Sequence, residues 1–181
     1  MSKSNRFPAR RIVTDAVLIA LYFALSFLSI KAWVIEISFK FLPVLLAALL
    51  FGPADGLIVG ALGAFAEQML SYGFTPTTVL WLLPAAACGL ITGLLRGRLT
   101  KAAWPRRLAL FVAIGVVCSL VNTLAFYADS RLFHYYTFEL IVLDGIWRLL
   151  KDAIITPLLG SLALELARRL RRAGLAQEGK A

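Results

Sequence analysis

Apolar residues dominate this chain in long runs, which short polar or charged tracts interrupt. Such runs, roughly 17–25 residues each, have the length of a helix that crosses a hydrocarbon layer of about 30 Å. Helices are expected because every backbone polar group in lipid must be hydrogen-bonded within its own segment. The pattern predicts six transmembrane helices, at about residues 12–30, 37–51, 53–70, 77–95, 108–128 and 140–166.

The composition supports this interpretation. Hydrophobic residues make up 60% of the 181 positions and charged residues 16%, and the mean hydropathy is +0.82, well outside the range of ordinary soluble domains. We therefore predict an all-α integral membrane protein that forms a single domain over residues 1–181. A signal peptide at the first segment is disfavoured because the apolar stretch is too long and five more follow it.

Basic residues predict the orientation of the chain. Although the net charge is +9, these residues lie in short tracts, which favours topology signals over a nucleic-acid surface. Only Lys31, Lys40 and Arg131 lie in the opposite loops. We therefore predict a multi-pass membrane protein with both termini on the cytoplasmic side. The tracts on the cytoplasmic side contain Lys3, Arg6, Arg10, Arg11, Arg96, Arg98, Lys101, Arg106, Arg107, Arg168, Arg169, Arg171, Arg172 and Lys180.

Small residues recur at every fourth position in three of the segments. This spacing places them on one helix face, where another helix can approach closely. In the third and fourth segments we expect packing within the bundle. In the first segment, packing and docking to another protein are about equally expected. The three sets are Ala16, Ala20 and Ala24; Gly52, Gly56, Gly60 and Ala64; and Ala85, Gly89, Gly93 and Gly97.

Polar residues of four segments are expected in the outer half of the bundle. They include Glu67, Gln68, Thr78, Trp81 and Asn122. The inner half is expected to be almost entirely apolar and small. Because polar groups do not continue through the membrane, the pattern favours a pocket that opens to the outside over a channel. Trp81 is the candidate for stacking on a planar ring.

The sixth segment carries four ionisable residues. Asp144, Arg148 and Asp152 are four positions apart and share a helix face, and Lys151 lies one turn from Arg148. Ionisable groups at this depth are costly and commonly mark a substrate site, so we predict that Arg148 and Lys151 bind ligand. The alternative is that the charges only neutralise one another and hold the bundle together.

The stretch KAWVIEISFK, residues 31–40, joins the first two segments. Its alternating apolar residues predict a short extended piece between Lys31 and Lys40. On the outer side it could form a lid over the pocket, with these lysines as ligand-binding residues. A tight connector with an aromatic anchor at Trp33 is an equally good interpretation.

Motifs for common chemistry are missing from the sequence. It contains no GxxxxGK[ST] phosphate loop, HExxH or GxSxG. Cys88, Cys118 and a single histidine are too widely separated for a convincing zinc site. No second half resembles the first, which disfavours a transporter built from inverted repeats. We predict no catalytic residues, metal or cofactor, and favour a small binding protein that obtains energy from its partners.

Several stretches resemble a known family. ALSFLSIK, IEISFKFLPVLLAALLFGPADGLIVGALGAF, LVNTLAFY and WRLLKDAIITPLL are similar to the substrate-binding S components of energy-coupling factor (ECF) vitamin transporters, in particular the folate-type branch. The resemblance covers nearly the whole chain. It implies that Ala16, Ala20 and Ala24 form the AxxxA face that docks on the transmembrane coupling subunit.

The family implies a division of labour. The S component captures a vitamin from outside, while a coupling subunit and two ATPase subunits drive its release inside. The resemblance also implies that KAWVIEISFK is a mobile lid loop. Folate is the best single prediction, with riboflavin, pantothenate or a queuosine precursor left open. A small membrane enzyme or assembly factor that acts at lipid head groups is the alternative of another class.

Overall fold

The computed structural model describes residues 9–28, 30–32, 35–133 and 137–173, and only the backbone of residues 30–32 and 35–37. Helices form most of this part of the chain. In order, the elements are α1 (Ala9–Phe27), β1 (Ile30–Ala32), β2 (Ile35–Ile37), α2 (Phe41–Leu50), α3 (Pro53–Tyr72), α4 (Thr78–Leu94), α5 (Arg96–Lys101), α6 (Trp104–Phe133) and α7 (Phe138–Arg172).

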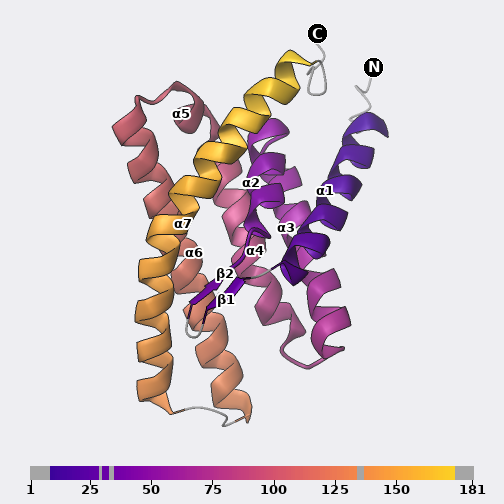
Figure 1. Ribbon diagram of the computed structural model, residues 1–181. Helices are drawn as coiled ribbons and strands as arrows, with labels where there is room; N and C mark the ends of the chain where they lie inside the picture. The colour runs from indigo at the N-terminus through magenta and orange to yellow at the C-terminus, as the bar shows by residue number, and fades with distance from the viewer. Residues whose placement is uncertain (1–8, 29, 33–34, 134–136, 174–181) are drawn as a thin grey trace, which may run out of the picture.

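Five long helices form a curved wall around one short helix. α1 packs on α3, α3 on α4, α4 on α6 and α6 on α7, while α2 contacts α1, α3, α4 and α7. The start of α1, the end of α7 and the short helix α5 lie at the same end of the bundle (Figure 1). The described basic tracts therefore gather at one end, as the charge pattern predicts.

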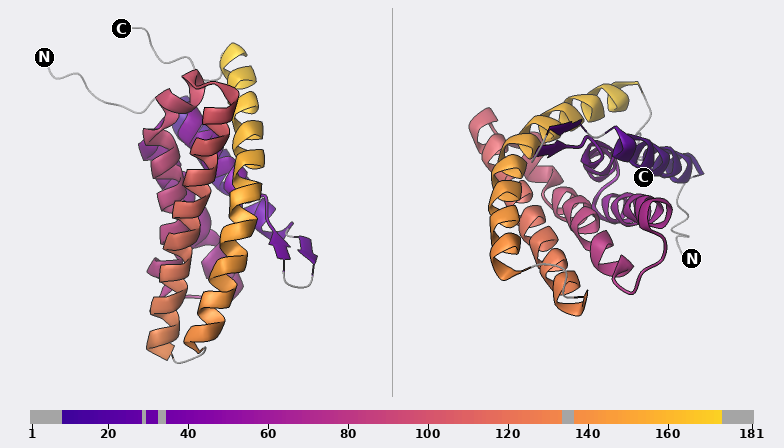
Figure 2. Two further views of the ribbon diagram at one scale, coloured as in Figure 1. Left: turned by 90° about the vertical axis from the view of Figure 1, so that its left-hand side faces the viewer. Right: turned by 60° about the horizontal axis from the view of Figure 1, so that its bottom comes forward.

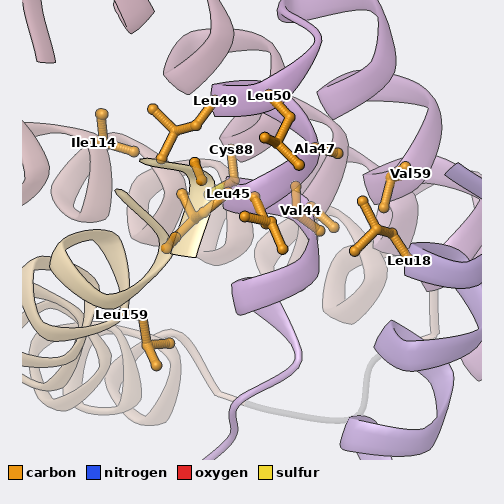
Figure 3. Close-up of a cluster of buried hydrophobic side chains, with 14 of the residues drawn as sticks. Leu18, Val44, Leu45, Ala47, Leu49, Leu50, Val59, Cys88, Ile114 and Leu159 are labelled. Carbon is orange, nitrogen blue, oxygen red and sulfur yellow. The ribbon is translucent and has the colours of Figure 1, made fainter. Parts of the chain in front are cut away.

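The helix α2 is the centre of the hydrophobic core. Every residue from Pro43 to Leu50 is buried, because neighbouring helices cover all faces of the segment. Leu45 and Leu49 lie among Cys88 of α4, Ile114 of α6 and Leu159 of α7 (Figure 3). Side chains of α1 and α3 complete the cluster on the other side of α2.

Glycines allow α3 and α4 to pack with their backbones almost in contact. A Cβ atom added at Gly56 would lie 2.6 Å from the carbonyl oxygen of Gly89, and one at Gly60 or Gly93 would meet the backbone of Ala85 or Pro53. The predicted packing of the third and fourth segments is therefore confirmed at these positions. Gly97 departs from the pattern, since no atom lies within 4 Å of its added Cβ.

Gly52 forms the turn from α2 to α3. Its φ of 118° lies in a region that residues with a side chain rarely adopt. Pro53 follows at the first position of α3, where its missing N–H leaves no hydrogen bond unmade.

Six helices, α1 to α4, α6 and α7, lie at the six predicted segments, but their lengths differ. α6 and α7 are longer than the predicted spans, and α5 was not predicted. Considering only length and composition, α6 is the one helix in the described part of the chain that qualifies to cross a membrane, whereas α2 and α4 are apolar but shorter. α1 and α7 are long but include charged residues. The six-span count and the cytoplasmic termini stay predictions.

The connection between α1 and α2 is a short β-hairpin. β1 and β2 pair antiparallel, with Ile30 opposite Ile37 and Ala32 opposite Ile35. The extended conformation predicted for this stretch is confirmed, and it explains why α2 starts at Phe41 instead of residue 37. Figure 2 shows the hairpin projecting from the side of the bundle.

We predict that Gly89→Ala destabilises the fold because the new methyl group would enter the backbone of α3. The expected cost is about 1–3 kcal/mol, as for overpacked cores, seen as a lower unfolding midpoint in detergent. Gly97→Ala is the matched control, since its methyl group meets no other atom. Equal midpoints for the two variants would contradict close packing of α3 on α4.

Candidate substrate-binding site

Arg148 of α7 is paired along its own helix. Its guanidinium Nη2 lies 2.5 Å from a carboxylate oxygen of Asp144, one turn earlier. The Arg148 side chain is 18% exposed, whereas that of Asp144 is 49% exposed. The arginine therefore lies inward from its partner, and the pair is accessible from the side of Asp144.

Lys151 and Asp152 form a looser pair one turn further along. The ammonium nitrogen lies 3.8 Å from a carboxylate oxygen, and both side chains are half-buried. The predicted pairing of Arg148 with Asp144 is thus present. The four ionisable residues from Asp144 to Asp152 lie in two adjacent pairs.

An aromatic ring connects Arg148 to a neighbouring helix. The guanidinium carbon of Arg148 lies 5.7 Å from the ring centroid of Phe126 in α6, within the range of a cation–π contact. The Trp81 ring of α4 lies 6.3 Å from the same centroid, at an interplanar angle of 54°. The fold thus brings a cation and two aromatic rings together from α4, α6 and α7.

Phe126 was missed in the sequence as a functional candidate. It lies four positions after Asn122, so both share one face of α6. That spacing could have identified Phe126, because Asn122 was already a candidate. Its aromatic side chain alone did not distinguish it from the many phenylalanines of an apolar helix.

A second ionic cluster lies at the beginning of α2. The ammonium nitrogen of Lys40 lies 2.7 Å from one carboxylate oxygen of Glu67 and 3.0 Å from the other. The Tyr22 side chain of α1 interacts with the same carboxylate. This cluster joins α1, α2 and α3. No ion pair or ring contact links it to the Arg148 cluster among the described residues.

The remaining candidates differ in their surroundings. The Thr78 hydroxyl accepts the Thr75 backbone N–H at 2.9 Å and is buried at the start of α4. Gln68 and Asn122 are half-buried and make no side-chain hydrogen bond within the described residues. Lys31 lies in β1, and its side chain is outside the described part. None of these is joined to Arg148 by a described contact.

The expectation of an almost entirely apolar inner half was wrong. Near the end that carries the basic tracts, Asp55 of α3 is completely buried and Asp15 of α1 is 8% exposed. The Nε of Arg11 donates to Asp55 at 2.6 Å, and Nη2 of Arg11 contacts the other carboxylate oxygen. Sequence reasoning missed this pair because it assigned Arg11 to a flanking basic tract.

The small-residue face of α1 points away from the bundle. Ala16, Ala20 and Ala24 are exposed, whereas Leu18 and Tyr22 on the same helix are buried. The structure therefore leaves this face uncovered. Among the described residues, no group of three or more His, Cys, Asp or Glu side chains could hold a metal ion.

The sequence matches one protein family over most of its length. Residues 10–167 match the family described as "ECF transporter, substrate-specific component". No curated protein matches the sequence.

Two solved structures share the fold. One is described as "Structure and mechanism of the S component of a bacterial ECF transporter"; the identity is 20%, the match covers 91% of this chain and 97% of the other, and the TM-score is 0.62. The other is "Crystal structure of FolT bound with folic acid", with 21% identity, 90% and 97% coverage and a TM-score of 0.60.

At these identities the structural similarity establishes the fold and leaves the ligand open. The family match extends from α1 into α7 and includes every helix between them. The chain therefore belongs to the family of substrate-specific components, or S components, of ECF transporters.

Proposed function

We propose that this S component captures a vitamin, most favourably folate, from the outer side of the bacterial plasma membrane. A transmembrane coupling subunit and two ATPase subunits would then drive its release inside. The observation that carries the proposal is the grouping of Arg148, Phe126 and Trp81 in a chain of this family. Membership of the family also makes the chain a transport component and not an enzyme.

The chemistry of this group suits a flat heterocycle that carries a carboxylate. A guanidinium presents parallel donors that match a carboxylate, and an indole ring offers a face for stacking. Because Asp144 is half-exposed, its pairing with Arg148 is weak and a ligand carboxylate could replace it. Folate carries both chemical features. The FolT structure with folic acid, which shares the fold, adds support for folate over the other vitamins.

The other residues predicted to bind the substrate stay proposed contributors of lower priority. They are Lys151, Lys40, Glu67, Gln68, Asn122, Thr78 and Lys31. Lys40 and Glu67 already satisfy one another, so a ligand would have to compete with that pair. Gln68 and Asn122 have side-chain groups still available for hydrogen bonds. Riboflavin, pantothenate and a queuosine precursor remain alternative ligands, because these residues do not discriminate among vitamins.

The proposed orientation follows the basic tracts. They gather at one end of the bundle (Figure 1), and lysine and arginine are retained on the cytoplasmic side. The Arg148 group would then lie in the outer half. The exposed alanines of α1 would dock on the coupling subunit, since small residues permit close helix contact.

The ligand itself can be identified by mass spectrometry of small molecules that remain bound during purification in detergent. We expect a vitamin that carries a carboxylate and a planar ring, and we predict that its mass is that of folate. A different vitamin would overturn folate but retain the S-component function. A protein that neither retains nor binds any vitamin would contradict capture itself.

We expect Arg148→Ala to weaken vitamin binding roughly tenfold to a hundredfold, because a charge-assisted hydrogen bond is lost. Arg169→Ala is the matched control, since Arg169 also pairs one turn back along α7, with Glu165, but outside the site. Titration calorimetry would measure binding, and thermal unfolding would measure stability. Unchanged affinity together with a large loss of stability in Arg148→Ala would favour a purely structural ion pair.

For α1, we expect Ala20→Leu to reduce vitamin uptake by more than about tenfold while binding to the isolated chain is unchanged, because the bulky side chain would block close helix contact. Ala113→Leu, at an exposed alanine of α6, provides the control. Uptake into proteoliposomes that contain the whole transporter is the measurement. Normal uptake by Ala20→Leu would exclude the alanine face as the docking site.

A further inference from the structure

We infer that the corner between α5 and α6 is a binding surface for anionic phospholipid head groups. We define this basic corner by Arg98, Lys101, Trp104 and Arg106. It lies at the end of the bundle opposite the end of α6 and the start of α7 (Figure 1). The inference is independent of the vitamin and of the docking face proposed above.

No acidic residue in the same stretch of the chain offsets the charge of the corner. No aspartate or glutamate occurs between Glu67 and Asp129, whereas five basic residues occur between 96 and 107. No described salt bridge involves Arg98, Lys101 or Arg106, and all three are exposed. A surface of this kind attracts anions, and in low-dielectric surroundings the attraction is strong.

The basic corner is part of the folded structure, held by a buried side chain and by hydrogen bonds. Leu99 is completely buried and anchors α5 to the bundle, so the charged residues on either side of it are presented outward. Arg107 donates to the carbonyl oxygens of Leu99, at 3.0 Å, and Ala102, at 2.8 Å. These two hydrogen bonds hold the turn from α5 to α6, so Arg107 has a structural role. That turn positions the backbone that carries Arg98, Lys101 and Arg106.

Apolar neighbours favour a membrane over an acidic protein as the partner. Trp104 is 59% exposed and Leu94, at the end of α4, is 67% exposed. Tryptophan is enriched where a helix leaves the hydrocarbon layer. The corner also includes the first turn of α6, the helix whose length and composition suit a membrane span. Cations beside exposed apolar side chains match a phosphate head group above its acyl chains.

The test uses the full chain in nanodiscs that contain equal amounts of phosphatidylglycerol and phosphatidylcholine. Native mass spectrometry would measure the ratio of the two lipids retained on the protein. We expect the wild type to enrich phosphatidylglycerol. The variant Arg98→Gln/Lys101→Gln/Arg106→Gln should lower that ratio roughly tenfold or more, since each basic residue near a membrane contributes to binding anionic lipid.

The matched control is Arg168→Gln/Arg169→Gln/Arg172→Gln, which removes the same charge from exposed residues of α7. It should retain most of the enrichment. An equal loss in both variants would overturn the corner as a defined site in favour of diffuse charge. Unchanged enrichment in the corner variant would overturn the inference directly.

Two further arms separate the remaining explanations. Arg98→Lys/Arg106→Lys preserves charge and should preserve enrichment, and a loss there would indicate that folding, not charge, is responsible. Inorganic phosphate should not displace phosphatidylglycerol, and full displacement would indicate a site for free anions. If enrichment persists in the corner variant while assembly with the coupling subunit fails, the corner is a protein interface and the inference is wrong.

Discussion

A ten-residue helix buried among four others is the constraint on which the rest of this structure depends. A helix as short as α2 spans about 15 Å, so its ends lie inside the bundle, where the unpaired backbone groups need partners from the protein. Arg171 of α7 donates to the carbonyl oxygen of Leu49, and Arg11 of α1 lies 3.5 Å from that of Phe51. The carboxyl end of α2 is thus held by arginines from two different helices.

One of these arginines also explains a buried acid, because Arg11 supplies the counter-charge for Asp55. Asp55 is completely buried and pairs with Arg11, whose side chain is 28% exposed, and a buried carboxylate without such a partner would be strongly destabilising. At the other end of α2, Lys40 lies where the helix dipole disfavours a positive charge, and Glu67 offsets it. Among the described residues, the contacts of Arg148 are with Asp144 of its own helix and Phe126 of α6, and not with either end of α2.

The same architecture separates the proposed vitamin-binding group around Arg148 from the proposed docking face of α1. α1 lies at one edge of the curved wall and α6 and α7 at the other, with α2 between them (Figures 1 and 2). The exposed alanines of α1 are therefore far from the Arg148 group. The tight glycine contacts of α3 and α4 make the middle of the wall stiff, because backbones in contact leave little space for side chains to rearrange.

The sequence by itself determined the helices, the small-residue packing at Gly56 and Gly89, and the gathering of basic tracts at one end. These features depend on local periodicity and on the distribution of charge along the chain, and both can be read from the amino-acid sequence. It also predicted Arg148 as a candidate, because an ionisable residue in an apolar helix is conspicuous. Only the tertiary structure decided that α2 is central, that Asp55 meets Arg11 and that Phe126 lies between Trp81 and α7. Such contacts join residues that are distant in sequence, so the physical reason for each lies in the packing of whole helices and not in any one segment.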